Sequence, residues 1–563
     1  MKKLRIGFLV DNLKPSSSVN ELIEFVDDNK SFDTPTLITG YKDTAHQTPI
    51  KKLVKKLKQR PSAFLELILR AILYRFIFKI EIKKAKTRFS KYGTNTDIRN
   101  LDEFKVVNVE GCWSKSNLFL EFTDREISLI SSCNLDCIIR CGSGILKGRI
   151  LDITEFGVIS FHHGDNRTNR GGPSGFWEVL NGEPSSGFII QKLNQELDGG
   201  EVLLRGNMMT SNLWLVNNGQ LLAKSNVFMM KLLLNLAVTR RLPNIEGVRL
   251  HGNKLYKTSS ADFIKYIFKI IVPKILKALV SKLTSPYTKR WSVAYAYHDE
   301  FNKSLWRYKE ISNPKGRFLA DPFVIEHGGK NFIFVEDLFF EDNKGRISVI
   351  RVNDDDYDFL GVVLEEDFHL SFPFVFKEKD DIYMIPESCK NFDIRLYKCV
   401  EFPHKWKFEK QLMVDIDAAD TMLFKNNDTW FMFTNICSAK MNDHQSELHI
   451  FYSDHFKDGS WQPIGSGNPV IFDPLKGRNA GMFVHKGKIY RVNQVHGQDH
   501  YGKSFSVNEI VKISKDEFIE RKVSTIEPNF KDSIISTHHF DANASLAAVD
   551  FARIERQKSV LNS

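Results

Sequence analysis

Two histidines and an aspartate are placed where they could accept and donate protons in a group-transfer reaction. His162 and His163 follow the apolar run 158–161, and Asp198 lies in the turn Leu197-Asp198-Gly199-Gly200. The end of a buried strand is where α/β proteins place their chemistry, and a carboxylate can orient an imidazole that accepts a proton. We therefore predict that His162 and Asp198 are catalytic, although Asp198 could also serve only to form the turn.

A loop rich in hydrogen-bonding residues follows the two histidines. It contains Asn166, Arg167, Arg170 and glycines at positions 171, 172 and 175. Guanidinium forks suit phosphate, so Arg167 and Arg170 are candidates for binding a phosphorylated acceptor such as a nucleotide sugar. Solvated surface charge is the equally open alternative. The loop has no GxGxxG and no Lys-Ser/Thr, so a phosphate-binding loop of the nucleotide type is not predicted.

In the order of these features, Gly157–Leu204 resembles the catalytic segment of the folate-dependent formyltransferases. In that family a strand ends in Asn-x-His, a loop crosses the folate site, and a Leu-Asp-x-Gly turn closes it. The resemblance implies transfer of a formyl group from 10-formyltetrahydrofolate to an amine. It implies that His162 is the base and Asp198 its orienting carboxylate.

One position departs from the family pattern, because Ser160-Phe161-His162 has serine where the family has asparagine. A serine hydroxyl reaches less far toward an oxyanion than a carboxamide does, so Asn166 or His163 could supply the missing donor. Ser160 and Asn166 are therefore both catalytic candidates. The resemblance places the pterin between the loop 140–144 and the segment 189–196. The candidate folate-binding residues are Arg140, Gly142, Ser143, Gly144, His163 and Leu197.

Alternating strands and helices must position these residues. Short apolar runs predict buried parallel strands, and polar-flanked periodic segments predict helices between them. The expected strands are 4–10, 34–39, 106–109, 135–140 and 158–161, and the expected helices are 18–26, capped by Ser18, and 124–131. This alternation predicts a Rossmann-like α/β domain with a parallel sheet.

Composition is that of an ordinary soluble protein with several domains. The chain has 563 residues, 42% of them hydrophobic and 26% charged. Its seven cysteines form no CxxC pair, and MKKLRIGFLVDN turns polar too early for a secretory signal, so we expect a reducing cytoplasm. The series Cys133, Cys137, Cys141 has no accompanying histidine, and no metal site is predicted.

Positive charge is concentrated in two apolar segments. Residues 51–91 hold 14 Lys/Arg against two acids, and residues 261–290 hold seven against one. Such segments fit helices lying on an anionic membrane surface, here the inner face of the membrane, or helical insertions packed on the protein with solvated lysines. Pro273 argues against one continuous helix in the second segment. The basic stretches lack aromatics interleaved on a sheet, so nucleic acid is not an expected partner.

From about residue 292 the chain changes to short strands with a repeated pattern. Similar strand–turn–strand units begin at 319, 370, 418 and 479. Antiparallel units at this spacing predict a β-propeller, whose fifth blade could combine 546–553 with 291–297. This half resembles the five-bladed, arabinanase-like propellers of glycoside hydrolases and the similar domain of plant glucosamine inositolphosphorylceramide transferases.

The hydrolase resemblance implies a central funnel with two aspartates and a glutamate. Asp321 matches the first aspartate and Asp420 could match the second, but the fourth repeat has Arg478-Asn479-Ala480-Gly481, without a carboxylate. A glycosidase without its acid cannot protonate a leaving group, so we expect carbohydrate binding instead. The expected funnel residues are Asp321, His369, Glu387, Asp420, Arg478 and His539. Aspartates that only fix blade registry are the alternative.

We therefore predict a multidomain α/β plus all-β protein. Its expected parts are a formyltransferase-like domain (1–210, with a basic helical insertion at about 51–92), a basic helical connector (211–290) and a five-bladed propeller (291–556). The expected activity is formyl transfer to an amino group of a nucleotide- or lipid-linked sugar in surface-polysaccharide biosynthesis. Two alternatives stay open: a glycosyltransferase or glycan-processing protein acting through the funnel, and a binding protein built from two degenerate enzyme domains.

Overall fold

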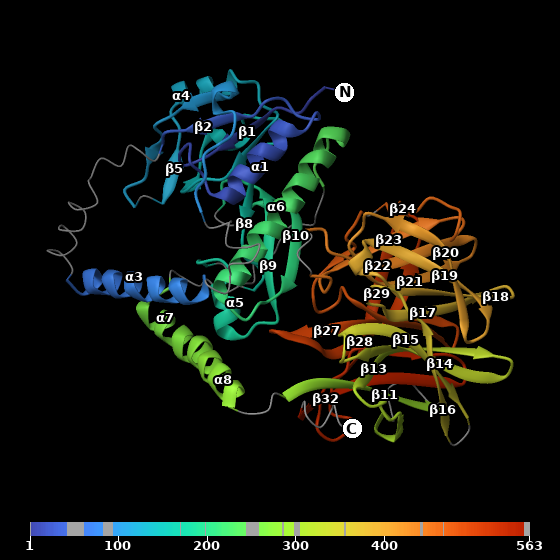
Figure 1. Cartoon of the computed structure of the whole chain (residues 1–563). Helices are drawn as coiled ribbons and strands as arrows, with labels where there is room; N and C mark the ends of the chain where they lie inside the picture. Colours follow the sequence, from blue (N-terminus) through green and yellow to red (C-terminus); the bar gives the residue numbers. More distant parts are fainter. Residues whose placement is uncertain are drawn as a thin grey trace. The chain divides into compact units, whose positions relative to one another are not determined.

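The computed structural model describes residues 2–41, 61–82, 94–116, 118–168, 171–196, 199–243, 258–283, 287–297, 305–353, 356–439, 443–465 and 467–556. The chain divides into two compact units, Met1–Lys274 and Ile275–Ser563, each described by itself below (Figure 1). The three expected domain boundaries stay predictions.

A seven-stranded sheet is the centre of the first unit, with strand order β10-β9-β8-β6-β1-β2-β3. Strands β8, β6, β1, β2 and β3 run parallel to one another. Strand β9 runs antiparallel to β8, and β10 runs antiparallel to β9. Their bounds are β1 Ile6–Leu9, β2 Thr36–Thr39, β3 Lys105–Asn108, β6 Cys137–Arg140, β8 Val158–His162, β9 Ser185–Lys192 and β10 Glu201–Met209. A small sheet holds β4 Cys112–Trp113, β5 Phe119–Glu121 and β7 Ile145–Leu146. The predicted α/β layer with a parallel sheet is confirmed.

Continuous apolar runs explain why this sheet is buried on both faces. All four residues of β1 and all four of β2 are buried, as expected for central parallel strands covered by helices. The covering and connecting helices are α1 Ser17–Asp28, α3 Pro61–Glu81, α4 Asp124–Ser131, α5 Phe176–Asn181, α6 Trp214–Thr239, α7 Ser260–Tyr266 and α8 Val272–Leu283, with short turns η2 Leu101–Glu103 and η3 Arg149–Asp152.

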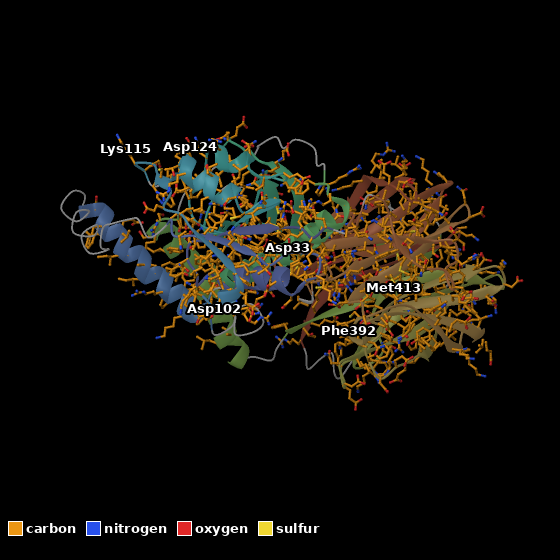
Figure 2. All side chains as sticks on the ribbon, turned by 90° about the horizontal axis from the view of Figure 1, so that it is seen from above. Asp33, Asp102, Lys115, Asp124, Phe392 and Met413 are labelled. Atoms are coloured by element: carbon orange, nitrogen blue, oxygen red, sulfur yellow. The ribbon has the colours of Figure 1, made fainter. Side chains whose placement is uncertain are left out.

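Helix ends follow from local capping chemistry. Helix α4 has its predicted bounds because Thr123 and Glu126 form a capping box, in which each side chain accepts from the other residue's backbone N–H. Asp124, in its first turn, is exposed at the surface (Figure 2) and pairs with Arg149 at 2.8 Å. The predicted cap of α1 is wrong. The helix begins at Ser17 with Ser16 in the cap position, and Ser18 is buried in the first turn.

Helix α6 lies in the segment that the sequence analysis assigned to the connector. It packs on β9 and α1, and its buried residues include Leu221, Phe228 and Leu233. Among the described helices it is long and apolar enough to cross a bilayer, but 61% of its most apolar window is buried inside the protein. We therefore describe α6 as a core helix of the first unit.

The segment after α7 accommodates Pro273 by widening the helix. A π-helical turn, η4 (Ile267–Ile271), joins α7 to α8 immediately before Val272 and Pro273. Proline has no N–H, and its ring would crowd the carbonyl one turn earlier, so a widened turn lets the helical path continue. The expected break at Pro273 is therefore a bulge in a helical run from Ser260 to Leu283.

The second unit is built from five successive antiparallel sheets. The first sheet holds β11 Tyr287–Tyr297, β12 Lys309–Glu310, β30 Ile534–Ser536, β31 Phe540–Ala542 and β32 Leu546–Arg556. The next two hold β13 Arg317–His327, β14 Lys330–Phe339, β15 Lys344–Val352 and β16 Tyr357–Leu364, then β17 Ser371–Glu378, β18 Asp381–Glu387, β19 Asp393–Glu401 and β20 Lys405–Val414. The last two hold β21 Ala418–Asn426, β22 Thr429–Ile436, β23 Glu447–Ser453, β24 Gln462–Pro463 and β25 Ile471–Phe472, then β26 Asn479–His485, β27 Lys488–Gly497, β28 His500–Ile513 and β29 Phe518–Ile526. Short helical turns are η5 Leu305–Arg307 and η6 Cys389–Asn391.

The two ends of this unit meet in one sheet, as the sequence predicted. Strand β11 pairs with β32 along its whole length, from Tyr287 opposite Arg556 to Tyr297 opposite Leu546 (Figure 1). The first strand of the unit is thereby held by its last one, which closes the unit without leaving either strand as a free edge.

Candidate functional site

Strands β6 and β8 bring the first group of predicted residues together. Arg140 and Ser160 are directly paired across the two strands. The Arg140 guanidinium donates to Ser160 Oγ at 3.4 Å and to the carbonyl of Gly144, which folds the loop 140–144 back on its strand. Burial lowers the pKa of Arg140. Ser160 is 1% exposed, and its hydroxyl donates to the Phe161 carbonyl at 3.2 Å, so it is already engaged.

The rest of this loop is anchored by two residues that the sequence analysis missed. Asp11 accepts from Ser143 N and Ser143 Oγ, both at 2.6 Å, and from the Tyr41 hydroxyl at 3.1 Å. A Cβ at Gly142 would overlap the Tyr41 hydroxyl, so this position requires glycine. Burial, reinforced by Asp11, raises the pKa of Tyr41. The place of Asp11 after β1, at the carboxyl edge of the sheet, is a signal that could have identified it; Tyr41 had none.

The two histidines differ in their surroundings. His163 stacks on Phe161, with ring centroids 5.4 Å apart, and its Nε2 lies 3.0 Å from Ser225 Oγ on α6. Burial and the neighbouring His162 lower the pKa of His163 to about 4, so its ring is neutral near pH 7. His162 is the last residue of β8 and is half-buried. His163 therefore helps to hold the strand on α6, whereas His162 ends the strand.

Asp165 organises the loop after the histidines. It accepts from Arg167 Nη2 at 2.6 Å, from Arg205 Nη1 at 2.5 Å and from Asn207 Nδ2 at 3.3 Å. Burial raises the pKa of Asp165, but the hydrogen bonds from Arg167 outweigh it and the net shift is downward. Arg167, proposed from sequence as a phosphate ligand, is thus paired within its own loop, with its side chain 49% exposed.

Asn166 presents a buried donor in the same loop. It is 1% exposed, and its Oδ1 accepts from Arg205 Nη2 at 2.9 Å. Its Nδ2 is buried and has no hydrogen-bond partner in the part of the chain that the structure describes. A buried N–H without a partner is costly and needs an explanation, such as a ligand atom that it would meet.

The turn between β9 and β10 reaches the loop that follows β7. Gly148 N donates to Gln195 Oε1, and Gln195 Nε2 donates back to the Gly148 carbonyl, both at 3.2 Å. Asn194 Nδ2 closes the turn on the Gly199 carbonyl at 2.7 Å. The predicted wall 189–196 is thus anchored to Gly148, which lies four residues beyond the other predicted wall, 140–144. Leu197, Asp198 and Arg170 lie outside the described residues, so their predicted roles stay predictions.

In the second unit, two candidate residues sit on strand irregularities. The first strands of three successive sheets each have a residue with left-handed backbone, at Asp321 (φ 49°), Phe372 (φ 45°) and Asp420 (φ 48°). At each one the pairing register shifts. A bulge re-aims the side chain, and such strained positions gather at functional sites.

Arg478 neutralises two of the three predicted funnel carboxylates. Its Nε lies 2.5 Å from Asp420 Oδ2, and its Nη2 lies 3.5 Å from Glu387 Oε2. Burial raises the pKa of Asp420 well above its ordinary value against the opposing charge of Arg478. Burial also raises the pKa of Glu387, but the Arg478 charge outweighs it and the net shift is downward. Glu387, on β18, and Asp420, on β21, therefore share the Arg478 guanidinium.

Asp321 lies in a second cluster with two histidines. The rings of His538 and His539 each have a nitrogen 3.6 Å from Asp321 Oδ1, and His538 Nδ1 lies 2.6 Å from Asp550 Oδ2. Burial would raise the pKa of Asp321, but these imidazoles and Arg478 lower it to about 2. Oxygen and nitrogen atoms of Asp321, His538 and Asp550 lie within 4.8 Å of one another, a set that could hold a cation. The sequence analysis found no such set because its members are far apart in the chain.

Comparison with known proteins finds two groups of relatives. Residues 307–547 match the family described as "Glucosamine inositolphosphorylceramide transferase 1, N-terminal". The protein of that name from Oryza sativa subsp. japonica is 34% identical over 215 residues, which is 37% of this chain and 28% of that protein. The chain thus spans less than a third of that relative. Methionyl-tRNA formyltransferase of Clostridium botulinum is 25% identical over 241 residues, covering 39% of this chain and 72% of that enzyme.

Solved structures fall into the same two groups. A thermostable family-43 glycoside hydrolase aligns with 43% of this chain and 91% of its own, at 17% identity and a TM-score of 0.32. A sugar N-formyltransferase from Shewanella sp. FDAARGOS_354 aligns with 45% of this chain and 76% of its own, at 13% identity and a TM-score of 0.26. Structural similarity as low as this does not indicate a shared activity.

Proposed function

We propose that the first unit transfers a formyl group from 10-formyltetrahydrofolate to an amino group of a nucleotide- or lipid-linked sugar, in surface-polysaccharide biosynthesis in the cytoplasm. The observation that carries this proposal is the buried Nδ2 of Asn166, which has no hydrogen-bond partner among the described residues. Asn166 lies four residues after His162 in the loop that leaves β8. The similarity to methionyl-tRNA formyltransferase supports the same reaction class.

The residues fit a folate donor in their chemistry. When bound, 10-formyltetrahydrofolate would supply the formyl carbon, held between the loop 140–144 and the segment 189–196. His162 would accept the proton that the attacking amine loses, and Asn166 Nδ2 would donate to the oxygen on which negative charge develops. Ser160 is less suited to that second role, because its hydroxyl already bonds the Phe161 carbonyl. Asp198 would orient His162.

Calorimetry with 5-formyltetrahydrofolate, a stable mimic of the donor, tests the folate site. We expect micromolar binding by the wild type and its loss in Asp198→Ala. In a formyl-transfer assay with nucleotide-linked amino sugars, Asn166→Leu should lower kcat by about 10²-fold, the usual cost of losing one oxyanion donor. Asn207→Leu is the matched control, since Asn207 is buried in the same network and bonds only Asp165 among the described hydrogen bonds. A wild type that does not bind the mimic would refute the proposal.

The second unit is proposed to be a five-bladed propeller that holds the glycan. Its five antiparallel sheets and the pairing of β11 with β32 support that architecture. Arg478 compensates Asp420 and Glu387, so the site suits hydrogen bonding to sugar hydroxyls more than protonation of a leaving group.

A second candidate places the chemistry in the funnel. It is favoured by the charges of Glu387 and Asp321, which both act on Asp420, and by the match to plant glucosamine inositolphosphorylceramide transferases. It predicts that folate is irrelevant, and that Asp321→Asn abolishes activity on the glycan while 5-formyltetrahydrofolate binding by the first unit is absent.

A further inference from the structure

Helix α3 has apolar side chains both on its core-facing side and on an adjacent, exposed side. One face packs in the core, where Leu73, Ile77 and Ile80 lie in the cluster of Phe176, Trp214, Phe263 and Tyr266. On the other face Leu65, Leu69, Ile72 and Phe76 are 65%, 42%, 58% and 49% exposed. Their spacing of four, three and four residues aligns them on one side of the helix. A helix that is apolar all round is normally buried on every side, so the outer face needs a partner.

Two carboxylates fix the orientation of α3. Near its start, Glu66 accepts from the backbone N–H and the hydroxyl of Ser260, at the beginning of α7. At its end, Glu81 accepts from the Tyr266 hydroxyl at 2.5 Å and from Leu215 N, in the first turn of α6, at 2.8 Å. Glu81 is fully buried, and burial raises its pKa. The helix is held at both ends, so it cannot turn its outer face inward without breaking these bonds.

The neighbouring helical run also exposes apolar side chains. Helices α3 and α7 lie side by side (Figure 1). Ile264 of α7 and Phe268 of η4 are 40% and 68% exposed. We call the six residues Leu65, Leu69, Ile72, Phe76, Ile264 and Phe268 the α3–α7 face. Further along, α8 exposes Ile275, Leu276, Leu279 and Val280 by 47% to 55%.

The exposed charges on these helices have one sign. Arg75 and Lys79 of α3 and Lys265 of α7 are exposed. The acids of the same helices accept hydrogen bonds from other residues of the protein. Glu66 and Glu81 do so as described above, and Asp262 accepts from the backbone N–H of Ser259, the N-cap residue of α7. An apolar surface flanked by cations is complementary to the interface of an anionic bilayer. Two copies meeting through this face would bring like charges together, which disfavours a homodimer.

We propose that the α3–α7 face docks the protein on the surface of an anionic lipid bilayer, with its apolar side chains in the headgroup region and Arg75, Lys79 and Lys265 at the lipid phosphates. This contact is peripheral: α3 keeps its inner face in the core and does not cross the membrane.

Vesicle flotation of the full chain tests the proposal. We expect binding to phosphatidylcholine vesicles that contain phosphatidylglycerol, and at least about tenfold weaker binding to pure phosphatidylcholine. The triple variant Leu65→Gln, Leu69→Gln, Ile72→Gln should lose about tenfold or more in binding to the anionic vesicles, since it removes three apolar anchors while glutamine preserves the helix. Arg75→Gln with Lys79→Gln should weaken binding to the anionic vesicles and leave the neutral ones unchanged.

The matched control makes the same chemical change elsewhere in the first unit. Leu118, Leu129 and Val238 are 52%, 47% and 61% exposed, and their replacement by glutamine should leave vesicle binding unchanged. Circular dichroism of each variant checks that it is folded. Absence of wild-type binding to anionic vesicles, or equal loss in the test and control variants, would overturn the proposal. So would a concentration-dependent dimer that the α3 variant abolishes, because the face would then be occupied by a second copy.

Discussion

The buried pair of Arg478 with Asp420 allows a quantitative test of the second unit. Arg478→Met removes the guanidinium that lies 2.5 Å from Asp420 and 3.5 Å from Glu387 while keeping much of the side-chain volume. Breaking a buried ion pair from one side leaves an uncompensated charge and typically costs about 3–5 kcal/mol of unfolding free energy. We expect a loss in that range, measured by urea denaturation with tryptophan fluorescence and by hydrogen exchange in β21 and β26.

An exposed pair of similar geometry provides the control. Arg521 lies 2.6 Å from Glu509 with its side chain 67% exposed, so Arg521→Met should cost far less unfolding free energy than Arg478→Met, because solvent screens an exposed pair. Adding either Glu387→Gln or Asp420→Asn to Arg478→Met should recover part of the loss, because each change removes one of the carboxylates that the guanidinium compensated. A cost of Arg478→Met no larger than that of the control, or no recovery in either double variant, would contradict this account of the cluster.

Two further predictions concern single buried groups. Burial raises the pKa of Asp541 to about 8, so the folded chain binds its proton more tightly than the unfolded chain does. This contribution to stability is lost as pH rises from about 4 to about 8. Asp541→Asn should make the unfolding free energy from urea denaturation fall less steeply over that range, and an unchanged pH profile would contradict the buried acid. Gly142→Ala would force a Cβ onto the Tyr41 hydroxyl and should weaken 5-formyltetrahydrofolate binding in calorimetry. Adding Tyr41→Phe removes that oxygen and should restore part of the binding. Failure of the double variant to recover binding would show that the clash is not the cause.

Local sequence patterns were sufficient for the elements of both units. The apolar runs at 135–140 and 158–161 became β6 and β8 because a central parallel strand needs side chains that can be buried on both faces. The repeated strand pairs, and the joining of the second unit's two ends in β11 and β32, also followed from pattern. The cap of α1 did not, because Ser16, Ser17 and Ser18 offer equivalent hydroxyls and the choice among them depends on the surrounding backbone.

Partnerships between distant residues were beyond sequence reasoning. Asp11 and Tyr41 hold the loop at Ser143 from more than 100 residues away, and no local pattern pairs them. The same is true of Arg478 with Asp420. Arg478 was noted as a funnel residue, but its effect on the two carboxylates depends on a distance that only the fold sets. The sequence identified the residue types, but the structure was needed to show which charged side chains compensate one another.

The contacts of Ser160 and Arg478 explain the two departures from the expected motifs. Ser160 replaces an asparagine, but its hydroxyl is engaged with the strand, while a carboxamide four residues after His162 keeps a buried N–H without a partner among the described residues. In the second unit an arginine stands where a catalytic carboxylate was expected, and it compensates the acids that remain. A donor aimed at developing negative charge suits acyl transfer, whereas a charge-compensated cluster suits binding of neutral hydroxyls. This contrast is the physical reason for proposing that the first unit performs the chemistry and the second one holds the sugar.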